Sequence, residues 1–285
     1  MQRSISSIKK HSFIFPFGRR RWLLLLGIFV FVLLIRHFCI GSYRISTHAM
    51  AEALHKGDYV LVNKLSLKSD LKRNRIILFK SPLQRDRDKT PLIVSRCVAL
   101  PGDTIEVSNA GYKINGILYP RSPQSLTSYI VSQEIRAPFV NLLNRMNIPV
   151  REPGEPKSLP TFILTPFEEY QIREEMNEKI NKLFVREKEE SYLIIVPRKG
   201  ETYRLNQGFI TTAREAIIAE STQEVSFPNR KLYLDGEEVK TFTFNRDYYW
   251  VLSDNTEDAV DSRHLGFIPA DHIVGSVWFR WYKAS

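Results

Sequence analysis

The feature that most constrains this chain is an apolar run from Trp22 to Ile35, after which apolar character resumes at Phe38 and continues to residue 40. As a helix, residues 22–35 would extend about 21 Å and residues 22–40 about 28 Å, close to the thickness of the hydrocarbon core of a bilayer. The longer span requires the side chains of Arg36 and His37 to reach the outer interface. We predict a transmembrane anchor over residues 22–40.

Basic residues gather ahead of this run, with Arg19, Arg20 and Arg21 directly before Trp22. The positive-inside rule therefore places residues 1–21 in the cytoplasm as a basic tail and the body of the chain outside. A cleaved secretory signal is the alternative, but the residues after the run lack the small-residue pair typical of a cleavage site. The tail also carries part of the formal net charge of +10. Because no motif for reading bases or phosphates accompanies that charge, we expect a lipid bilayer as a partner and no nucleic acid.

Beyond the anchor, the sequence changes to short β-branched and aromatic runs bounded by Gly, Pro and charged residues, which is typical of strands. The pairs Asn115-Gly116 and Asp235-Gly236 each suit a two-residue hairpin turn. We predict a mainly β, antiparallel body formed by residues 43–118 and 242–285. The expected strands lie within residues 59–63, 75–79, 92–94, 104–107, 112–119, 231–239, 248–252 and 272–281.

Between the two halves of this body the composition shifts, and we predict that residues 119–241 form an inserted α+β cap. Thr165 is followed by Pro166 and Glu168, a capping box with proline at the first helical position. Apolar residues then follow at helical spacing, and we expect this stripe to pack on its own domain rather than bind a partner. The stripe consists of Phe167, Tyr170, Met176, Ile180 and Leu183.

The two cysteines, Cys39 and Cys97, are too few for a disulfide framework, and no Cys/His cluster has the spacing of metal ligands. We expect both cysteines to be small apolar packing residues. No metal and no cofactor are expected.

Four blocks, at residues 43–62, 73–80, 95–103 and 253–266, resemble in order and spacing the sequence boxes of the type I signal peptidase (leader peptidase) family. In residues 43–62, Met50, Leu54 and the Gly57-Asp58 pair match a box that reads Ser-x-Ser-Met-x-Pro-Thr-Leu-x-x-Gly-Asp in the family. Residues 73–80 resemble its Arg-Gly-Asp box with the Gly-Asp pair lost. Residues 95–103 (Ser-Arg-Cys-Val-Ala-Leu-Pro-Gly-Asp) and 253–266 (beginning Ser-Asp-Asn, where the family has Gly-Asp-Asn) resemble the third and fourth boxes.

The resemblance covers the anchor and residues of about 43–119 and 242–281. It implies the signal peptidase I fold and a serine endopeptidase that processes signal peptides with a Ser/Lys dyad. It also implies a single-pass protein of the bacterial cytoplasmic (inner) membrane with its body on the outer, periplasmic side.

Mapped by this resemblance, the catalytic positions have lost their chemistry. The family's nucleophilic serine is replaced by Ala49, its lysine base by Ser95, and the serine that orients the lysine by Ala259. Thr47 alone is retained as an oxyanion donor. A hydroxyl without an adjacent base is a weak nucleophile. His48, His55 and His264 are possible bases, but no third group is evident to orient any of them.

The remaining residues of the boxes have structural roles in this interpretation. We expect Asp261, Ser262 and Arg263 to form ion pairs and hydrogen bonds that hold the fourth block against Arg96 and Asp254.

The sequence thus favours a membrane-anchored pseudoenzyme of the signal peptidase I family that binds exported preproteins or an active paralogous signal peptidase. Two alternatives remain. One is an active signal peptidase that uses displaced groups, and the other is a membrane-tethered interaction protein that acts through its insertion.

Overall fold

The computed structural model describes residues 17–50, 53–65, 71–83, 90–108, 111–119, 121–123, 125–154, 157–187, 191–255 and 259–282. The chain is mainly β, and every strand pairing between its named strands is antiparallel, as predicted. Short 3₁₀ helices cover Gln133–Ile135, Pro228–Arg230 and Ala270–His272.

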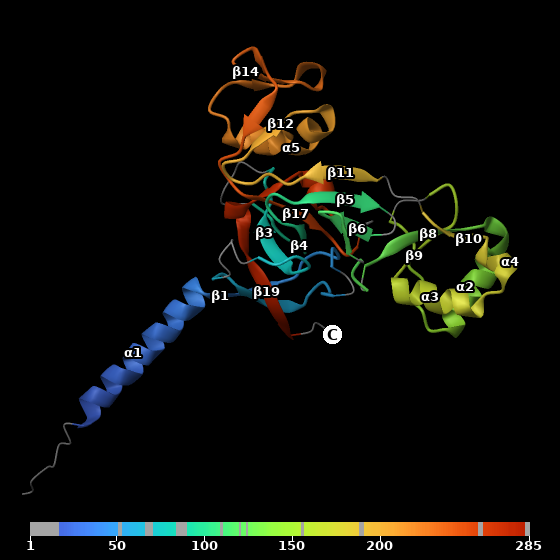
Figure 1. Cartoon of the computed structure of the whole chain (residues 1–285). Coiled ribbons are helices and arrows are strands. Elements are labelled where there is room, and N and C mark those ends of the chain that lie inside the picture. The colour runs from blue at the N-terminus through green and yellow to red at the C-terminus, as the bar shows by residue number, and fades with distance from the viewer. Residues whose placement is uncertain are drawn as a thin grey trace, which may run out of the picture.

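The main body is a seven-stranded sheet in the order β1-β2-β19-β3-β4-β17-β18 (Figure 1). Buried apolar side chains cover it, and Ile77 and Phe79 are among those that are fully enclosed. The strand that comes last in the sequence, β19, lies in the middle of the sheet between β2 and β3. The strands are β1 (Ile40–Arg44), β2 (Tyr59–Asn63), β3 (Ile76–Lys80), β4 (Leu92–Ala99), β17 (Tyr248–Leu252), β18 (Ile268–Pro269) and β19 (Ile273–Tyr282).

A four-stranded sheet in the order β11-β5-β6-β7 packs on the body. Its strands are β5 (Thr104–Ser108), β6 (Gly111–Ile114), β7 (Ile117–Tyr119) and β11 (Tyr192–Ile195). The predicted hairpin is confirmed, because Asn115 and Gly116 between β6 and β7 both adopt positive φ, 52° and 82°. A type I′ turn requires positive φ at both central residues.

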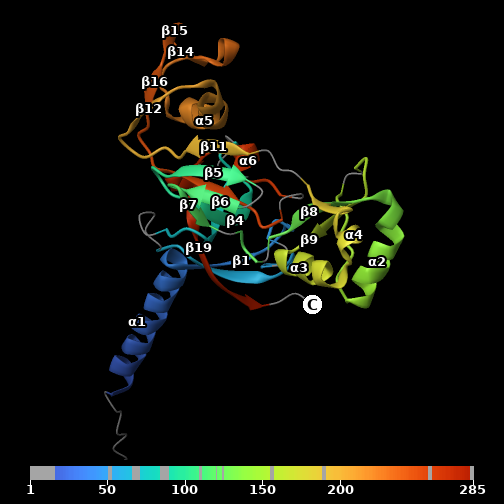
Figure 2. The same ribbon diagram turned by 45° about the vertical axis from the view of Figure 1, so that its right-hand side comes forward.

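A separate lobe stands beside the body and is built from residues 127–187 (Figure 2). Its sheet, in the order β10-β8-β9, packs against helices around a core of its own that includes Tyr129, Phe162 and Phe184. The elements are β8 (Thr127–Val131), α2 (Arg136–Arg145), β9 (Thr161–Leu164), α3 (Pro166–Glu175), α4 (Glu178–Asn181) and β10 (Phe184–Arg186).

The capping box that begins α3 is confirmed, but the predicted apolar stripe is wrong in part. α3 ends at Glu175, because the side chain of Asn177 accepts a hydrogen bond from Ile180 and begins a second helix, α4. Phe167 and Tyr170 are 63% and 62% exposed rather than packed on the lobe. Only Met176 of the predicted stripe is buried, joined by Ile172.

The second part of the predicted insertion lies above the body in Figure 1. Its helix α5 (Gln207–Glu220) packs Phe209, Ala213 and Ile217 into the same core as Phe244 and Trp250. The Asp235-Gly236 hairpin is confirmed by φ angles of 50° and 86°. The strands are β12 (Thr202–Arg204), β13 (Val225–Ser226), β14 (Leu232–Leu234), β15 (Glu237–Val239) and β16 (Thr241–Thr243). The limits of the insertion, 119 and 241, stay a prediction.

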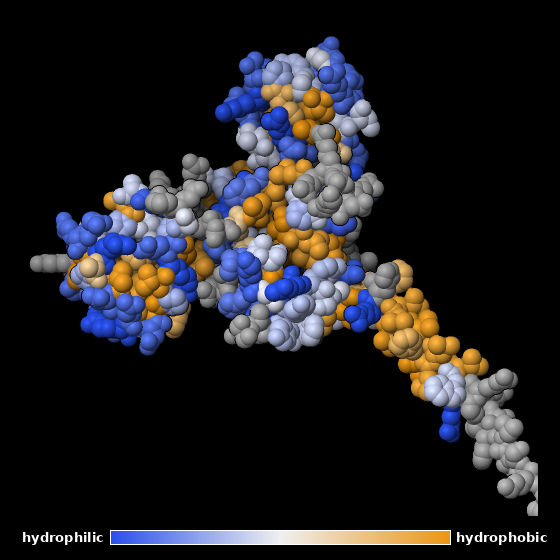
Figure 3. Space-filling model, turned by 180° about the vertical axis from the view of Figure 1, so that it is seen from behind, coloured by the Kyte–Doolittle hydropathy of each residue, from blue (hydrophilic) through white to orange (hydrophobic). Residues whose placement is uncertain are grey.

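The apolar run forms α1 (Phe17–Phe38), which projects from the body with exposed apolar side chains from Trp22 to Leu34 (Figure 3). It ends before the predicted residue 40, because Ile40 already pairs with Asn63 in the sheet. Within the described part of the chain, no helix is long and apolar enough to cross a membrane. The predicted span over 22–40 is therefore not confirmed.

Candidate functional site

The first block forms a closed loop between β1 and β2. The Ile45 N–H donates to the Asp58 carbonyl and the Gly57 N–H donates to the Ile45 carbonyl, each over 2.8 Å. Gly57 has a φ of 99°, which a side chain would strain, so its retention has a backbone reason. Met50 is fully buried in the cluster beneath the loop. These contacts fix Ala49, which is 3% exposed, against the body.

The fourth block docks directly onto this loop. The backbone N–H of Asn255 donates to the Ala49 carbonyl over 2.9 Å, and its side-chain amide donates to the His48 carbonyl over 3.3 Å. The Asp254 N–H approaches the Met50 sulfur at 3.5 Å. Residues 253–255 thus lie against the position that the family resemblance assigns to the nucleophile.

Ser95 lies on β4, fully buried, on the other side of the same segment. Its hydroxyl donates to the Val94 carbonyl over 2.8 Å and lies 3.1 Å from the hydroxyl oxygen of Ser253. Because Ser95 uses its proton on Val94, the Ser253 hydroxyl is the donor to Ser95. The segment 253–255 therefore brings Ala49 and Ser95, the two predicted dyad positions, to one site.

The other predicted site residues are less closely tied to it. Thr47 is exposed and Ala259 is half-buried. His264 is exposed and has its Nδ1 3.9 Å from Asp261, while the Nδ1 of His55 lies 3.7 Å from Asp58. None of the hydrogen bonds that join Ala49, Ser95 and Ser253 to the rest of the described chain comes from a histidine side chain.

Two ion pairs, rather than one network, support the fourth block. The Arg96 guanidinium donates to both carboxylate oxygens of Asp254, over 2.8 and 2.6 Å. The Arg263 guanidinium donates to both oxygens of Asp261, over 3.0 and 2.9 Å. The pairs are linked through the backbone, because the Ser253 N–H donates to Asp261 over 2.9 Å.

The Asp261 pair also begins a short helix, α6 (Ser262–Leu265), by accepting the Arg263 N–H. The Ser262 hydroxyl oxygen accepts the Val251 N–H over 2.9 Å. These contacts position the backbone that carries Ser253.

The third block holds an ion pair that the sequence analysis did not predict. Arg73 donates to both oxygens of Asp103 over 2.9 and 2.6 Å, and Asn115 donates to it over 2.9 Å. Burial raises the pKa of Asp103, but hydrogen bonds from Arg73, the Leu100 N–H and Asn115 outweigh burial, so the net pKa lies below its usual value.

Sequence reasoning also missed Ser253 and Asn255 as site residues. The signal for Ser253 was available, since it stands where the family box has glycine. Its contact with Ser95 could not be read from the sequence, because the two residues are 158 positions apart and only the fold brings them together.

Neither of the two predicted dyad positions holds an activated nucleophile. The Ala49 methyl group carries no reactive atom, and the Ser95 hydroxyl contacts a carbonyl and another hydroxyl, neither of which is a base. Cys97, two residues along β4, is fully buried, and burial raises the pKa of its thiol to about 12. It is therefore a neutral thiol at physiological pH.

Two strand edges border the site. In the part of the chain that the structure describes, β1 pairs only with β2, and residues 92–95 pair only with β3 because β17 joins β4 from Arg96 onward. An extended peptide can add to such edges through its backbone.

Comparison with known proteins places these features in one family. The family model described as signal peptidase, peptidase S26, matches residues 19–147 and 196–282. Signal peptidase I of Helicobacter pylori (strain ATCC 700392 / 26695) is 22% identical over 285 residues, covering 91% of this chain and 80% of the relative. Signal peptidase I of Aquifex aeolicus (strain VF5) is 25% identical over 256 residues, covering 89% and 80%. A signal peptidase I of Bacillus amyloliquefaciens is 32% identical over 89 residues, covering 30% and 44%.

Proposed function

The chain belongs to the signal peptidase family, peptidase S26, and we propose that it is a non-catalytic member that binds the extended segment of exported preproteins. The observation that carries the proposal is the buried Ser95–Ser253 hydroxyl pair. It occupies the position where the family resemblance requires a lysine base, beside an alanine in place of the nucleophile.

The hydroxyl pair supports the view that the packing around position 95 differs from that of the family's site, in addition to the loss of the catalytic groups. A lysine at position 95 would extend its side chain toward Ser253, which is 2% exposed and fills that space. A glycine there, as in the family box, would leave room for a longer neighbour. The Ser95 and Ser253 substitutions therefore complement one another in volume and in hydrogen bonding, as close-packed interiors require.

Peptide binding needs none of the lost groups. Strand addition uses backbone hydrogen bonds, and the free edges of β1 and of residues 92–95 border Ala49 and Ser95. The ion pairs of Asp254 and Asp261 keep these elements in place although no chemistry depends on them. Retention of the scaffold without the dyad supports a binding role.

Site-specific photocrosslinking tests this role. A crosslinking residue replacing Arg44 on β1 or Leu92 on β4 should capture a preprotein, and excess extended peptide should compete. The control replaces Lys231, which is exposed near β14 on the opposite side of the body (Figure 1). Equal capture at all three positions, or capture at none, would reject the groove. Mass spectrometry of the captured chain distinguishes a preprotein from a paralogous signal peptidase.

Membrane attachment through α1 and the basic residues before it is part of the same proposal. Its support is the row of exposed apolar side chains from Trp22 to Leu34 behind Arg19-Arg20-Arg21. A reporter fused after Ser285 should be active only outside the cytoplasm, and the mature protein should keep Met1 or Gln2 as its first residue. Cytoplasmic reporter activity, or a mature N-terminus near Ser42, would reject the anchor.

A second function, a tether that binds its partner through the insertion, is favoured by one observation. The family match leaves out residues 148–195, and that segment carries the exposed Phe167 and Tyr170. Capture of a partner by a crosslinking residue at Tyr170, with none at positions 44 and 92, would favour the tether over the groove.

A further inference from the structure

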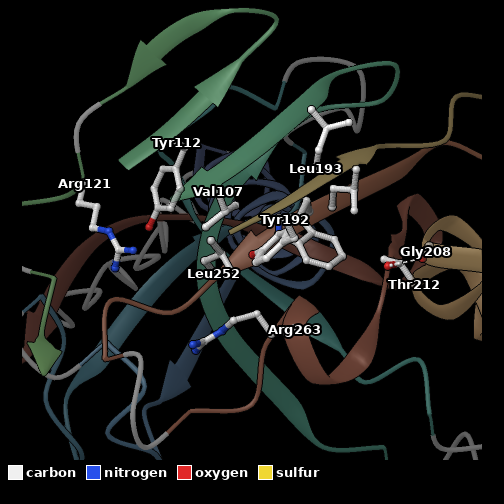
Figure 4. Close-up of a pocket in the computed structure, with 11 residues that line it drawn as sticks. Val107, Tyr112, Arg121, Tyr192, Leu193, Gly208, Thr212, Leu252 and Arg263 are labelled. Carbon is white, nitrogen blue, oxygen red and sulfur yellow. Dashed lines mark hydrogen bonds between the residues drawn. The ribbon is translucent and has the colours of Figure 1, made fainter. Parts of the chain in front are cut away.

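The four-stranded sheet β11-β5-β6-β7 presents one of its two faces to solvent. The inner face packs Val107 and Ile114 into the core of the body. In Figure 4, Val107 and Tyr192 point toward Leu252, whereas Leu193 points away from them. Because successive side chains of a strand alternate between its two faces, the residues between the buried ones lie on the outer face.

Four side chains form a row across this outer face, one from each strand. The register places Leu193 of β11 opposite Glu106 of β5. Glu106 is in turn opposite Lys113 of β6, and Lys113 is opposite Leu118 of β7. Neighbouring strands lie about 4.8 Å apart, so the row extends roughly 14 Å. Across the sheet it reads apolar, acidic, basic, apolar.

All four side chains of the row are accessible to a partner. Leu193 and Leu118 are 65% and 54% exposed. The Lys113 ammonium lies 3.6 Å from the Glu106 carboxylate, and both of these side chains are nearly half exposed. An antiparallel sheet face that meets only water usually carries polar residues. The two exposed leucines on either side of the charges therefore indicate a contact surface.

The row is complementary to itself. When two copies face each other about a two-fold axis that runs along the strands, Leu193 of each copy lies opposite Leu118 of the other. Glu106 of each copy then lies opposite Lys113 of the other, so each carboxylate has one ammonium group beside it and a second across the interface. An axis perpendicular to the strands, in the plane of the interface, would place Glu106 opposite Glu106, which repels. The charge pattern therefore selects one symmetric arrangement of two copies.

We propose that the outer face of this sheet binds a second copy of the chain about the axis that runs along the strands. Sheets that pack face to face lie about 10 Å apart, a distance that a glutamate and a lysine side chain span together. The leucines at the two ends limit the access of water to the four charges, which strengthens their attraction. Because charges at the centre of an interface also lose hydration, we expect a weak dimer that dissociates as salt is added. The proposal is independent of the groove, because none of the four residues belongs to the candidate site.

Sedimentation of the full chain in detergent, in a solvent matched to the density of the detergent, tests the proposal. The wild type should show a concentration-dependent equilibrium between monomer and dimer, and the dimer fraction should fall as sodium chloride is added. Association through the apolar side chains of α1 would not weaken in this way. A chain that is monomeric at every concentration at which it is soluble, or a dimer that salt does not weaken, overturns the proposal.

Charge reversals test how the two copies are arranged. Glu106→Lys alone and Lys113→Glu alone should each weaken self-association at least about tenfold, because like charges then meet across the interface. An equimolar mixture of these two variants should associate again, since every charge of one variant faces its opposite in the other. The double variant with both changes should also dimerise, because its row is again complementary to itself. Unchanged self-association of either single variant, or failure of the mixture or of the double variant to associate, overturns the proposal.

Leu118→Ala gives a second measurement that leaves all charges in place. It removes an apolar contact twice in a symmetric dimer, so it should weaken self-association about tenfold. The matched control is Leu159→Ala, because Leu159 is 50% exposed but lies in the separate lobe, and this change should leave association unaltered. Thermal unfolding checks the fold of each variant, and if a single charge reversal does not fold, the double variant and Leu118→Ala decide. Equal self-association of Leu118→Ala and wild type, or equal weakening by Leu118→Ala and Leu159→Ala, overturns the assignment to this face.

Discussion

The hydroxyl oxygens of Ser95 and Ser253 lie 3.1 Å apart, and both side chains are closed off from solvent. A longer side chain at either position would meet the other. The first prediction can therefore be tested by measuring the free energy of unfolding, without an assay for peptidase activity.

Ser95→Lys should lower the free energy of unfolding by about 1–3 kcal/mol or more, since it overpacks the site and buries an amine. Adding Ser253→Gly should recover part of that loss by removing the obstructing hydroxyl. Thermal unfolding of the single and double variants measures this coupling.

The control for this coupling is Ser262→Gly, because Ser262 is a buried serine of the same block that binds the Val251 N–H instead. It should give no recovery in the Ser95→Lys background. A Ser95→Lys protein as stable as wild type would show that position 253 does not fill the space of a lysine.

The wild-type chain should not cleave a preprotein in detergent, because Ala49 offers no nucleophile and no base adjoins Ser95. In comparable serine proteases, loss of the nucleophile alone costs about 10⁶ in rate. Ala49→Ser should restore little by itself. Any rescue should need Ser95→Lys, Ala259→Ser and Ser253→Gly as well.

Clear turnover by the unmodified chain would contradict this prediction. A Thr47→Ala and Ser95→Ala double variant then tests its origin, since activity that survives both changes comes from neither of these hydroxyls. Activity that disappears would assign the chemistry to one of these two hydroxyls.

Arg96→Met should destabilise the fold by about 3–5 kcal/mol, because it leaves the Asp254 carboxylate buried without its partner. The side chains of Arg96 and Asp254 are 12% and 5% exposed. The matched control is Arg246→Met, which breaks an exposed pair with Asp271 whose side chains are 41% and 51% exposed. That change should cost at most about 1 kcal/mol. If chemical denaturation gave equal losses of unfolding free energy for the two variants, burial would not determine how much the Arg96–Asp254 pair stabilises the fold.

Acid should weaken the fold partly through Asp103, whose pKa in the folded chain lies below its usual value of about 3.9. A carboxyl with a lowered pKa contributes stability above its unfolded pKa, and that contribution is lost as pH falls through the folded value. Asp103→Asn should therefore unfold more readily at pH 7 and show a shallower loss of stability between about pH 5 and pH 2. Denaturation midpoints across this range test it, with the exposed Asp271→Asn as control. Parallel curves for Asp103→Asn and wild type would refute it.

Features that depend on neighbouring residues could be predicted from the sequence. The Asn115-Gly116 and Asp235-Gly236 turns follow from backbone freedom, and the capping box at Thr165 follows from local hydrogen bonding. The strands around them were found for the same reason, since alternation and β-branching act within a few residues.

Features that depend on contacts between distant segments could not be predicted from the sequence. Periodicity predicted a buried stripe along one helix, but Asn177 begins a second helix, and α3 packs Ile172 rather than Phe167 and Tyr170 into the core of the lobe. The positions of Ala49 and Ser95 came from family boxes, and their role in any chemistry stays a prediction. What the boxes did not reveal is that Ser253 and Asn255 join them, because those contacts form only when the fourth block docks on the first.

The place of β19 in the sheet has a consequence for how the chain is made. β19 lies between β2 and β3, and its partners in β2 were synthesised more than 200 positions earlier. At about 5–20 residues per second, β1–β2 and β3–β4 therefore wait roughly 10–40 s on the ribosome with open edges before the strand that joins them emerges. Premature termination before Ile273 would therefore release a chain whose main sheet is divided in two, because β2 and β3 would lack the strand that joins them. With these open edges, the product would be prone to aggregation and a substrate for quality-control proteases, rather than a shortened but folded protein.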